Sequence, residues 1–234
     1  MYENVFKRVE KKYLLSEEQR KLLFEKINQN LVKDKYYKST ICNIYFDTIN
    51  DDLIINSLEK PKFKEKVRLR SYKVPTLEDE VFLEIKAKFK GVVGKRRLKM
   101  SLESFYDYLE KNEYDKNLQI MKEINYYFEY YSLKPAIFIA YDRISYRGCD
   151  DDNLRITLDS NLRSRYDNLR LEDGDMGEKY FDKKTYIMEI KTLGAMPLWL
   201  VRSLSELKIY PTSFSKYGRI HEKKIEKERL EYAK

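Results

Sequence analysis

The residues best suited to chemistry in this chain are glutamates that alternate with lysines and arginines. In residues 81–90, VFLEIKAKFK, the charged residues Glu84, Lys86 and Lys88 recur at every second position, with apolar residues between them. This period predicts a β-strand with one apolar and one charged face. Lysine and arginine bind phosphate oxygens, and a carboxylate beside them can bind a divalent cation. Taken alone, the segment is also compatible with an ordinary strand whose charged face is solvated.

The same alternation recurs along the chain, which favours a shared site over unrelated solvated faces. The other charged faces carry Arg8, Glu10 and Lys12 in residues 5–15; Lys66, Arg68 and Arg70 in 64–72; Lys95, Arg97 and Lys99 in 95–100; Tyr141, Arg143 and Arg147 in 136–147; Arg155, Thr157 and Asp159 in 153–162; and Glu189 and Lys191 in 185–192. The opposite faces of these segments are mostly apolar.

Helices are expected between these strands. Ser16 and Gln19 have the spacing of a capping box, and the apolar stripe of the helix that they begin extends to Leu31. Further helices are expected over residues 51–59, 101–111, 116–131, 197–207 and 216–234, and further strands over 40–48 and 209–214. The order favours a single α+β domain over residues 1–234 with a mostly antiparallel sheet.

Two arrangements of such a sheet are possible. In an open sheet, the cations face water. In an eight-stranded barrel whose apolar faces pack on outer helices, the charged faces line the inside, where one small ligand fits. Because like charges repel at close range, such a lining needs a polyanion, and phosphate chains suit it. The carboxylates of Glu10, Glu84 and Glu189 on the same faces then provide ligands for Mg²⁺ or Mn²⁺.

Composition narrows the partners and the location. The net charge of +8 favours an anionic partner, but most aromatic residues fall on apolar faces or helices, which argues against nucleic acid. One histidine, His221, and two separated cysteines leave no multi-histidine zinc site and no disulfide framework. The sequence shows neither an apolar secretory signal nor an apolar run long enough to cross a bilayer, so we expect a cytoplasmic protein. A separate membrane-bound subunit would place it at the inner face of the membrane.

The ordered motifs resemble those of the VTC-type polyphosphate polymerase domain, in the triphosphate tunnel metalloenzyme (CYTH-like) superfamily. The matching segments are KRVEKKY (7–13), IYFDT (44–48), VRLRSY (67–72), FLEIK (82–86), GKRR (94–97), YDRISYRG (141–148), LRITLD (154–159), MEIK (188–191) and SFSKYGR (213–219). Each motif is weak alone, but nine in order cover nearly the whole chain.

The resemblance implies an eight-stranded antiparallel barrel, a tunnel with basic walls, and transfer of the terminal phosphate of ATP to a polyphosphate chain. It implies phosphate contacts for Lys12, Arg68, Arg70, Lys86, Arg143, Arg155, Lys191 and Lys216. Among these, we expect Lys12, Arg68, Arg70, Lys86, Arg143 and Lys216 to act in catalysis. It also implies that Glu189 is the main ligand of Mn²⁺ or Mg²⁺, with Glu84 as a helper.

Two positions depart from the family pattern. Hydrolases of the superfamily carry ExExK on the first strand, and here the three positions are Arg8, Glu10 and Lys12. A cation therefore replaces the first carboxylate, which favours the polymerase branch. In the last motif the polymerase branch commonly has a lysine before FSK, and here that position is Ser213, with Lys216 retained.

Several charged residues are compatible with more than one role. We expect Arg8, Lys66, Lys88, Arg97, Arg155, Lys191, Tyr141 and Ser213 to contribute to substrate binding. However, Lys66 and Lys88 are equally compatible with solvent exposure, Arg97 with a surface patch, and Glu10 with a salt bridge to Lys12. The resemblance implies that the partners are ATP and inorganic polyphosphate or triphosphate. The alternatives to a polymerase are a tunnel triphosphatase and a non-catalytic sensor of polyphosphate, and the sequence does not give the oligomeric state.

Overall fold

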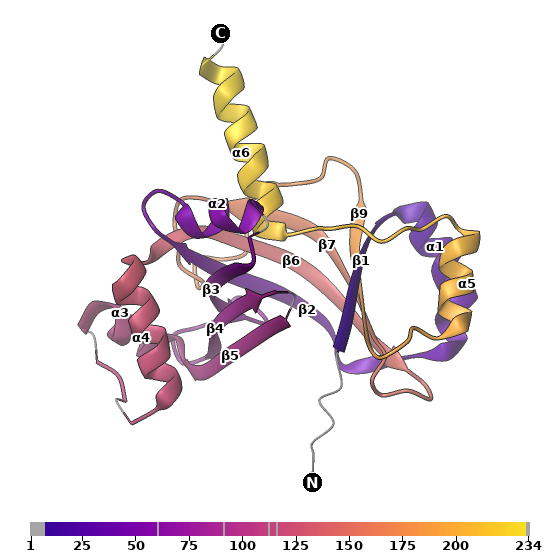
Figure 1. Ribbon diagram of the computed structural model, residues 1–234, viewed down its shortest axis with the longest axis horizontal. Helices are drawn as coiled ribbons and strands as arrows, with labels where there is room; N and C mark the ends of the chain where they lie inside the picture. The colour runs from indigo at the N-terminus through magenta and orange to yellow at the C-terminus, as the bar shows by residue number, and fades with distance from the viewer. Residues whose placement is uncertain (1–7, 60, 91, 112, 116, 233–234) are drawn as a thin grey trace. The chain divides into compact units, whose positions relative to one another are not determined.

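The computed structural model describes residues 8–232, apart from positions 60, 91, 112 and 116 (Figure 1). The chain divides into two compact units, each of which is described by itself. Unit 1 comprises Met1–Ser39, Tyr141–Leu162 and Lys179–Phe214, and unit 2 comprises Thr40–Ala140, Arg163–Glu178 and Ser215–Lys234.

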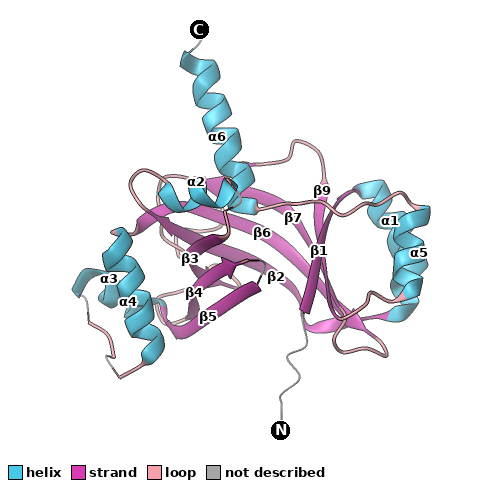
Figure 2. Cartoon of the chain, in the orientation of Figure 1, coloured by secondary structure: helices cyan, strands magenta, loops and turns pink. Residues whose placement is uncertain are grey.

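The described chain contains nine strands and six α-helices, which confirms the predicted α+β class (Figure 2). The strands are β1 (Arg8–Ser16), β2 (Leu31–Asp47), β3 (Phe63–Ser71), β4 (Glu80–Phe89), β5 (Val92–Ser101), β6 (Lys134–Gly148), β7 (Arg155–Arg165), β8 (Glu178–Lys179) and β9 (Thr185–Leu193). The helices are α1 (Glu17–Ile27), α2 (Asp52–Leu58), α3 (Leu102–Lys111), α4 (Gln119–Tyr131), α5 (Leu198–Glu206) and α6 (Lys216–Tyr232).

The strands form an antiparallel sheet in the order β1-β9-β7-β6-β2-β3-β4-β5, with β8 paired to β7. Within the described residues this order begins at β1 and ends at β5, so the sheet is not closed there. The eight-stranded barrel predicted from the sequence requires a pairing between the two end strands. The described residues do not make that pairing.

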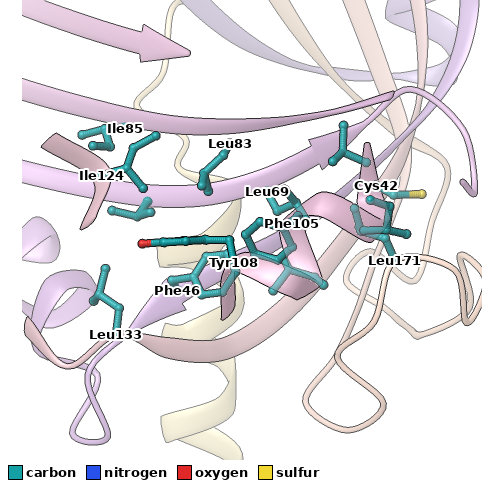
Figure 3. Close-up of a cluster of buried hydrophobic side chains, with 14 of the residues drawn as sticks. Cys42, Phe46, Leu69, Leu83, Ile85, Phe105, Tyr108, Ile124, Leu133 and Leu171 are labelled. Carbon is teal, nitrogen blue, oxygen red and sulfur yellow. The ribbon is translucent and has the colours of Figure 1, made fainter. Parts of the chain in front are cut away.

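In unit 2 the apolar faces of the strands pack against α3 and α4. Figure 3 shows Phe46, Leu69 and Leu83 of the strands beside Phe105 and Tyr108 of α3, and all five are buried. Because side chains alternate between the two faces of a strand, this packing turns the charged face of β3 and β4 away from the hydrophobic core.

In unit 1 a second core lies between strands and the pair of helices α1 and α5. Leu15 of β1 and Met188 of β9 pack in one cluster with Leu23 of α1 and Leu200 of α5. The alternation along β1 and β9 again places the charged residues on the opposite face. Thus both units use one face of their strands for burial and leave the other for polar chemistry.

The capping box predicted before α1 is present. The hydroxyl of Ser16 accepts the backbone N–H of Gln19 at 3.1 Å, and the Gln19 side chain accepts the backbone N–H of Ser16 at 3.2 Å. However, the helix ends at Ile27 and does not reach Leu31, because the 3₁₀ turn Asn28–Asn30 follows it. Asparagine favours such turns over helix interiors.

Other boundaries also differ from the sequence prediction. β2 begins at Leu31, nine residues before the predicted start of that strand. Residues 209–214 make only an isolated bridge, between Thr212 and Lys12, in place of the predicted strand. Pro211 lacks the N–H that a ladder would need. Residues 5–7, which the predicted first strand includes, lie outside the described residues.

None of the described helices is both long enough and apolar enough to cross a lipid bilayer.

Candidate functional site

In unit 2 the strand register aligns charged and polar side chains in a row across four strands. Tyr45 of β2 lies opposite Arg68 of β3, Arg68 opposite Glu84 of β4, and Glu84 opposite Arg97 of β5. A neighbouring row aligns Lys66, Lys86 and Lys95, and Arg70 lies opposite Asn43. The antiparallel ladder therefore concentrates cations from β3, β4 and β5 on one face.

Glu84 is the centre of this cluster. Its carboxylate contacts Arg68 at 2.8 Å, Lys95 at 2.8 Å, Arg97 at 2.5 Å and Arg70 at 4.0 Å, while its side chain is only 1% exposed. Burial alone would raise the pKa of Glu84, but Arg68, Arg70 and Lys95 hold that pKa well below its usual range. The carboxylate is therefore ionised at neutral pH and acts as the counter-ion of the cluster.

Four cations share this one carboxylate, so the cluster carries a net positive charge. The side chains of Arg97 and Lys95 are 34% and 43% exposed, which leaves their outer surfaces accessible. Lys86, also exposed, adds a further charge beside Lys95. An arrangement of fixed guanidinium groups and lysines with excess positive charge is suited to the oxygens of a polyanion.

The positive charges of this cluster also lower the pKa values of two tyrosines, Tyr45 and Tyr72. Burial alone would raise the pKa of Tyr45, but the charges of Arg68, Arg70 and Lys66 lower it to about 8. The hydroxyl of Tyr45 accepts a hydrogen bond from Arg68 at 3.0 Å. At Tyr72, whose hydroxyl accepts from Arg97 at 2.9 Å, positive charge likewise outweighs burial and lowers the pKa. Both tyrosine hydroxyls therefore lie beside positively charged groups of unit 2.

A second polar cluster lies in unit 1, where β1 pairs with β9. Lys12 lies opposite Glu189, and Glu10 lies opposite Lys191. The ammonium group of Lys12 is 3.4 Å from Glu189 and 3.6 Å from Glu10, and that of Lys191 is 3.3 Å from Glu189 and 3.9 Å from Glu10. These separations exceed those of tight charge-assisted hydrogen bonds, in contrast to the contacts around Glu84.

Arginines on β6 and β7 extend the cluster in unit 1. Arg143 donates two hydrogen bonds to the buried carboxylate of Asp159, at 2.6 and 2.7 Å, and its guanidinium lies 5.3 Å from the ring centroid of Tyr141. Arg155 contacts Asp34 of β2 at 2.9 Å and Ser145 at 3.1 Å. Asp159 and Asp34 hold these two arginines, and the guanidinium of Arg143 also lies 4.0 Å from Glu189.

The carboxylates of unit 1 fit a divalent cation that arrives with a phosphate ligand. Within the described ranges, no group of three or more His, Cys, Asp or Glu side chains is arranged to hold a metal. However, Glu10 and Glu189 share one face, and Thr157, opposite Glu189, has a buried hydroxyl that makes no hydrogen bond. Mg²⁺ commonly binds one or two carboxylates, and phosphate oxygens complete its shell. Glu84 fits this role less well, because four cations already surround it.

The predicted site residues thus fall into two groups. Unit 2 brings together Lys66, Arg68, Arg70, Lys86, Arg97 and Glu84, and unit 1 brings together Glu10, Lys12, Tyr141, Arg143, Arg155, Glu189 and Lys191. Four other residues lie elsewhere: Lys88 is exposed opposite Lys64, Ser213 is exposed before α6, Lys216 begins α6, and Arg8 begins β1 opposite Leu193.

Several polar residues of these clusters escaped the sequence prediction. Asn43 and Tyr45 lie on the polar face of β2, and their alternation with apolar residues was the available signal. Asn43 accepts from Arg70 at 2.9 Å, which fixes that guanidinium. Nothing in the sequence indicates that Asp34 belongs to the site, because β2 begins at Leu31 and the alternation of side chains predicts a strand only from residue 40.

Comparison with protein families identifies the family of this chain. Residues 7–222 match the family model of the VTC domain. The protein therefore belongs to the VTC domain family, within the triphosphate tunnel superfamily that its motifs resemble. Membership of this family supports binding of triphosphate or polyphosphate, and the family generally uses divalent metals.

One solved structure with a TM-score above 0.5 supports the fold. A Bacillus halodurans protein described as a putative adenylate cyclase is similar with a TM-score of 0.53 and 16% identity, over 89% of this chain and 93% of that one. The PH1819 protein of Pyrococcus horikoshii is similar with a TM-score of 0.48 and 16% identity, over 93% and 99% of the two chains. Comparison with curated proteins gives no match.

Proposed function

We propose that this chain is a polyphosphate polymerase, which transfers the γ-phosphate of ATP to a growing chain of inorganic polyphosphate. The observation that carries the proposal is the Glu84 cluster, in which four cations within 4.0 Å share one buried carboxylate. Such a cluster is suited to repeated phosphate groups rather than to a single small anion.

The role of the cations is positioning and charge stabilisation. We propose that Arg68, Arg70 and Lys86 bind phosphate oxygens, and that Glu84 keeps the guanidinium groups in place before the ligand arrives. Because Arg68 and Arg70 are fixed by Tyr45 and Asn43 as well as by Glu84, little side-chain freedom is lost on binding. The transferred phosphoryl group then meets preorganised positive charge, which favours the transition state over the free reactants.

The transfer itself needs no nucleophile from the protein. A terminal phosphate oxygen of the polyphosphate chain attacks the γ-phosphorus of ATP, the bond from that phosphorus to the β-γ bridging oxygen breaks, and ADP leaves with the electron pair. The attacking oxygen is already ionised at neutral pH, so no general base is required. We propose that Lys12, Arg143 and Lys191 in unit 1 also contact phosphates and that Lys216 contributes from the start of α6.

A divalent cation fits this proposal. Glu189 and Glu10 would hold Mn²⁺ or Mg²⁺ together with phosphate oxygens of the ligand. When bound, the ion would supply Lewis-acid neutralisation of phosphate charge.

The second candidate function is hydrolysis of inorganic triphosphate or a nucleoside triphosphate, with water as the acceptor at the same residues. Hydrolases of the superfamily carry a carboxylate at the first position of ExExK, where this chain has Arg8. That substitution favours transfer to phosphate. A protein that binds polyphosphate without turnover is the third outcome.

Incubation of the purified chain with ATP and Mn²⁺, with and without a short polyphosphate primer, tests these functions. A polymerase produces a ladder of long chains on a gel stained for polyphosphate, and Glu189→Gln abolishes it. Glu206→Gln, which changes an exposed glutamate of α5, is the matched control and should leave the ladder intact. Free phosphate without a ladder would assign a triphosphatase, and triphosphate binding without turnover would assign a sensor.

A further inference from the structure

The first turn of α6 makes side-chain contacts with the charged face of unit 2. The hydroxyl of Ser215, directly before α6, accepts a hydrogen bond from the ammonium group of Lys66 at 2.8 Å. The same oxygen accepts the backbone N–H of Gly218 at 3.2 Å, which is the geometry of a helix N-cap. Ser215 therefore joins the start of α6 to a cation of β3, and α6 itself begins beside α2 (Figure 1).

Tyr217 makes a second connection, one residue into the helix. Its hydroxyl donates to the buried carboxylate of Asp47 at 3.0 Å. That carboxylate also accepts the backbone N–H groups of Leu53 and Ile54 in α2, which fix its position. Burial and the nearby charge of Asp47 raise the pKa of Tyr217, so its hydroxyl stays protonated and remains a donor.

The ring of Tyr217 in turn packs against the cation cluster. Its centroid is 5.0 Å from that of Tyr45, whose hydroxyl accepts from Arg68 at 3.0 Å. The ammonium group of Lys66 lies 6.0 Å from the centre of the Tyr217 ring. The contacts thus run from α2 through Asp47 and Tyr217 to Tyr45 and on to Arg68.

These contacts restrain the side chain of Lys66. Lys66 lies opposite Lys86 in the ladder, so the two ammonium groups repel each other. A lysine has many rotamers, and fixing one costs free energy unless partners hold it. The Ser215 hydroxyl and the Tyr217 ring supply such partners without adding a negative charge, so the positive charge that a phosphate would meet is kept.

We propose that Ser215 and Tyr217 are positioning residues for phosphate binding, which hold Lys66 directly and Arg68 through Tyr45. The inference rests on the proposed function, because it assigns the positioned cations to a phosphate chain. It gives the first turn of α6 a role distinct from that of Lys216, which is proposed to contact phosphate itself.

A double-mutant cycle separates positioning from simple helix capping. Binding of inorganic triphosphate to the full chain is measured by calorimetry for the wild type, Ser215→Ala, Lys66→Met and the double variant. Ser215→Ala is expected to weaken binding about five- to tenfold, which is within the usual net contribution of one hydrogen bond. In the Lys66→Met background the same change should have almost no effect, because Ser215 then has no ammonium group to hold.

Two further variants keep the test decisive. Ser215→Thr retains the hydroxyl and should bind as the wild type does. If Ser215→Ala does not fold, Ser215→Gly removes the hydroxyl with little loss of capping and replaces it in the cycle. The control is Ser205→Ala, which changes an exposed serine of α5 that makes no side-chain hydrogen bond among the described contacts.

Tyr217 is tested by the ionisation of Tyr45. Tyr217→Phe removes the bond to Asp47, and the resulting freedom of the Tyr45–Arg68 contact should move the phenolate titration of Tyr45 to higher pH. The exposed Tyr126→Phe should leave that titration unchanged. An unchanged titration in Tyr217→Phe would overturn the role of Tyr217.

The remaining outcomes are distinct. Equal losses from Ser215→Ala with and without Lys66 would reduce Ser215 to a helix cap and overturn its positioning role, although the proposed function would stand. A wild-type chain that binds no triphosphate would overturn the proposed function, and this inference with it.

Discussion

Glu84 has the environment of a counter-ion: it is buried, ionised and shared by Arg68, Arg70, Lys95 and Arg97. A single carboxylate cannot neutralise four cations, but it can fix their positions. In the absence of ligand it reduces the repulsion among them, and it leaves enough positive charge to attract phosphate. The residue therefore links the stability of unit 2 to the function proposed for it.

Glu84→Gln is expected to lower the free energy of unfolding at neutral pH by about 3 kcal/mol. Removing one partner of a buried ion pair leaves the other charges uncompensated, which usually costs about 3–5 kcal/mol. We expect the lower value because Arg97 and Lys95 are partly exposed. Urea unfolding measures the loss, with Glu206→Gln as the control. Added triphosphate should stabilise the variant more than the wild type, because it supplies the missing negative charge.

The difference in the free energy of unfolding between the wild type and Glu84→Gln should depend on pH in a defined direction. The pKa of Glu84 in the folded protein lies well below its value of about 4.3 in the unfolded chain. The stabilisation is therefore fully present above that unfolded-state value and is lost as the pH falls toward the folded-state pKa. The gap between wild type and Glu84→Gln should stay constant near neutral pH and narrow below about pH 4. A constant gap at all pH values would contradict the role of Glu84.

Tyr45 provides a spectroscopic report on the same charges. Its pKa of about 8 should appear as one phenolate among 21 tyrosines when the chain is titrated by ultraviolet difference absorbance. Tyr45→Phe should remove that step, and Arg68→Met should move it to higher pH by removing a positive charge. Bound triphosphate should also raise the pKa, because an anion disfavours the phenolate. A step that triphosphate leaves unmoved would place the ligand away from this cluster.

At the scale of elements, the alternation of side chains was the most predictable feature. The period-two pattern of residues 81–90 predicts a strand, and β4 spans Glu80–Phe89 with Glu84 and Lys86 on its charged face. What the pattern could not give is the register between strands. The pairing of Arg68 with Glu84 and of Glu84 with Arg97 depends on turn geometry and on packing against α3 and α4.

The sequence prediction missed Tyr45, Asn43 and Asp34 for the same physical reason. Tyr45 and Asn43 become site residues only because β2 lies beside β3, a fact of topology. Asp34 belongs to a part of β2 whose sequence, VKDKYYK, has no clear apolar face, so tertiary pairing rather than local pattern makes it a strand. The sequence alone therefore predicts which residues carry charge on which strands, but not which of them share a partner.

Within unit 2, a buried polar contact joins α4 to β3, on the face of β3 opposite its charged face. Glu65 of β3 is buried and accepts hydrogen bonds from the hydroxyls of Tyr127 and Tyr131. Replacing both tyrosines by phenylalanine should lower the free energy of unfolding by about 2–4 kcal/mol, because the carboxylate loses both donors in a buried environment.

Urea unfolding of Tyr127→Phe/Tyr131→Phe checks this value. The matched control is Tyr126→Phe, since Tyr126 lies on the same helix but is 59% exposed, and that change should alter stability by less than about 0.5 kcal/mol. Triphosphate affinity should stay close to that of the wild type, since Glu65 faces away from Arg68. A loss of affinity equal to that of a cluster variant would show that α4 shapes the charged face as well.

At the scale of the whole molecule, chain continuity favours a single cooperative unit despite the two compact parts. β2, β6 and β7 each contain residues of both units, so neither unit consists of one contiguous segment. When one part unfolds, each of these three strands must be interrupted within its own length. We therefore expect one unfolding transition for the described chain, as in a single domain.

Trp199, the single tryptophan, makes this prediction testable because it lies in α5 of unit 1. Its fluorescence reports unit 1, whereas amide hydrogen exchange along β4 reports unit 2. The two probes should give the same midpoint and the same free energy of unfolding in urea, and saturating triphosphate should shift both equally. Trp199→Phe should abolish the fluorescence change while leaving exchange along β4 unaltered, which assigns the signal. If the Trp199 transition precedes that of β4, the units unfold independently, and the ligand should then protect only the unit that binds it.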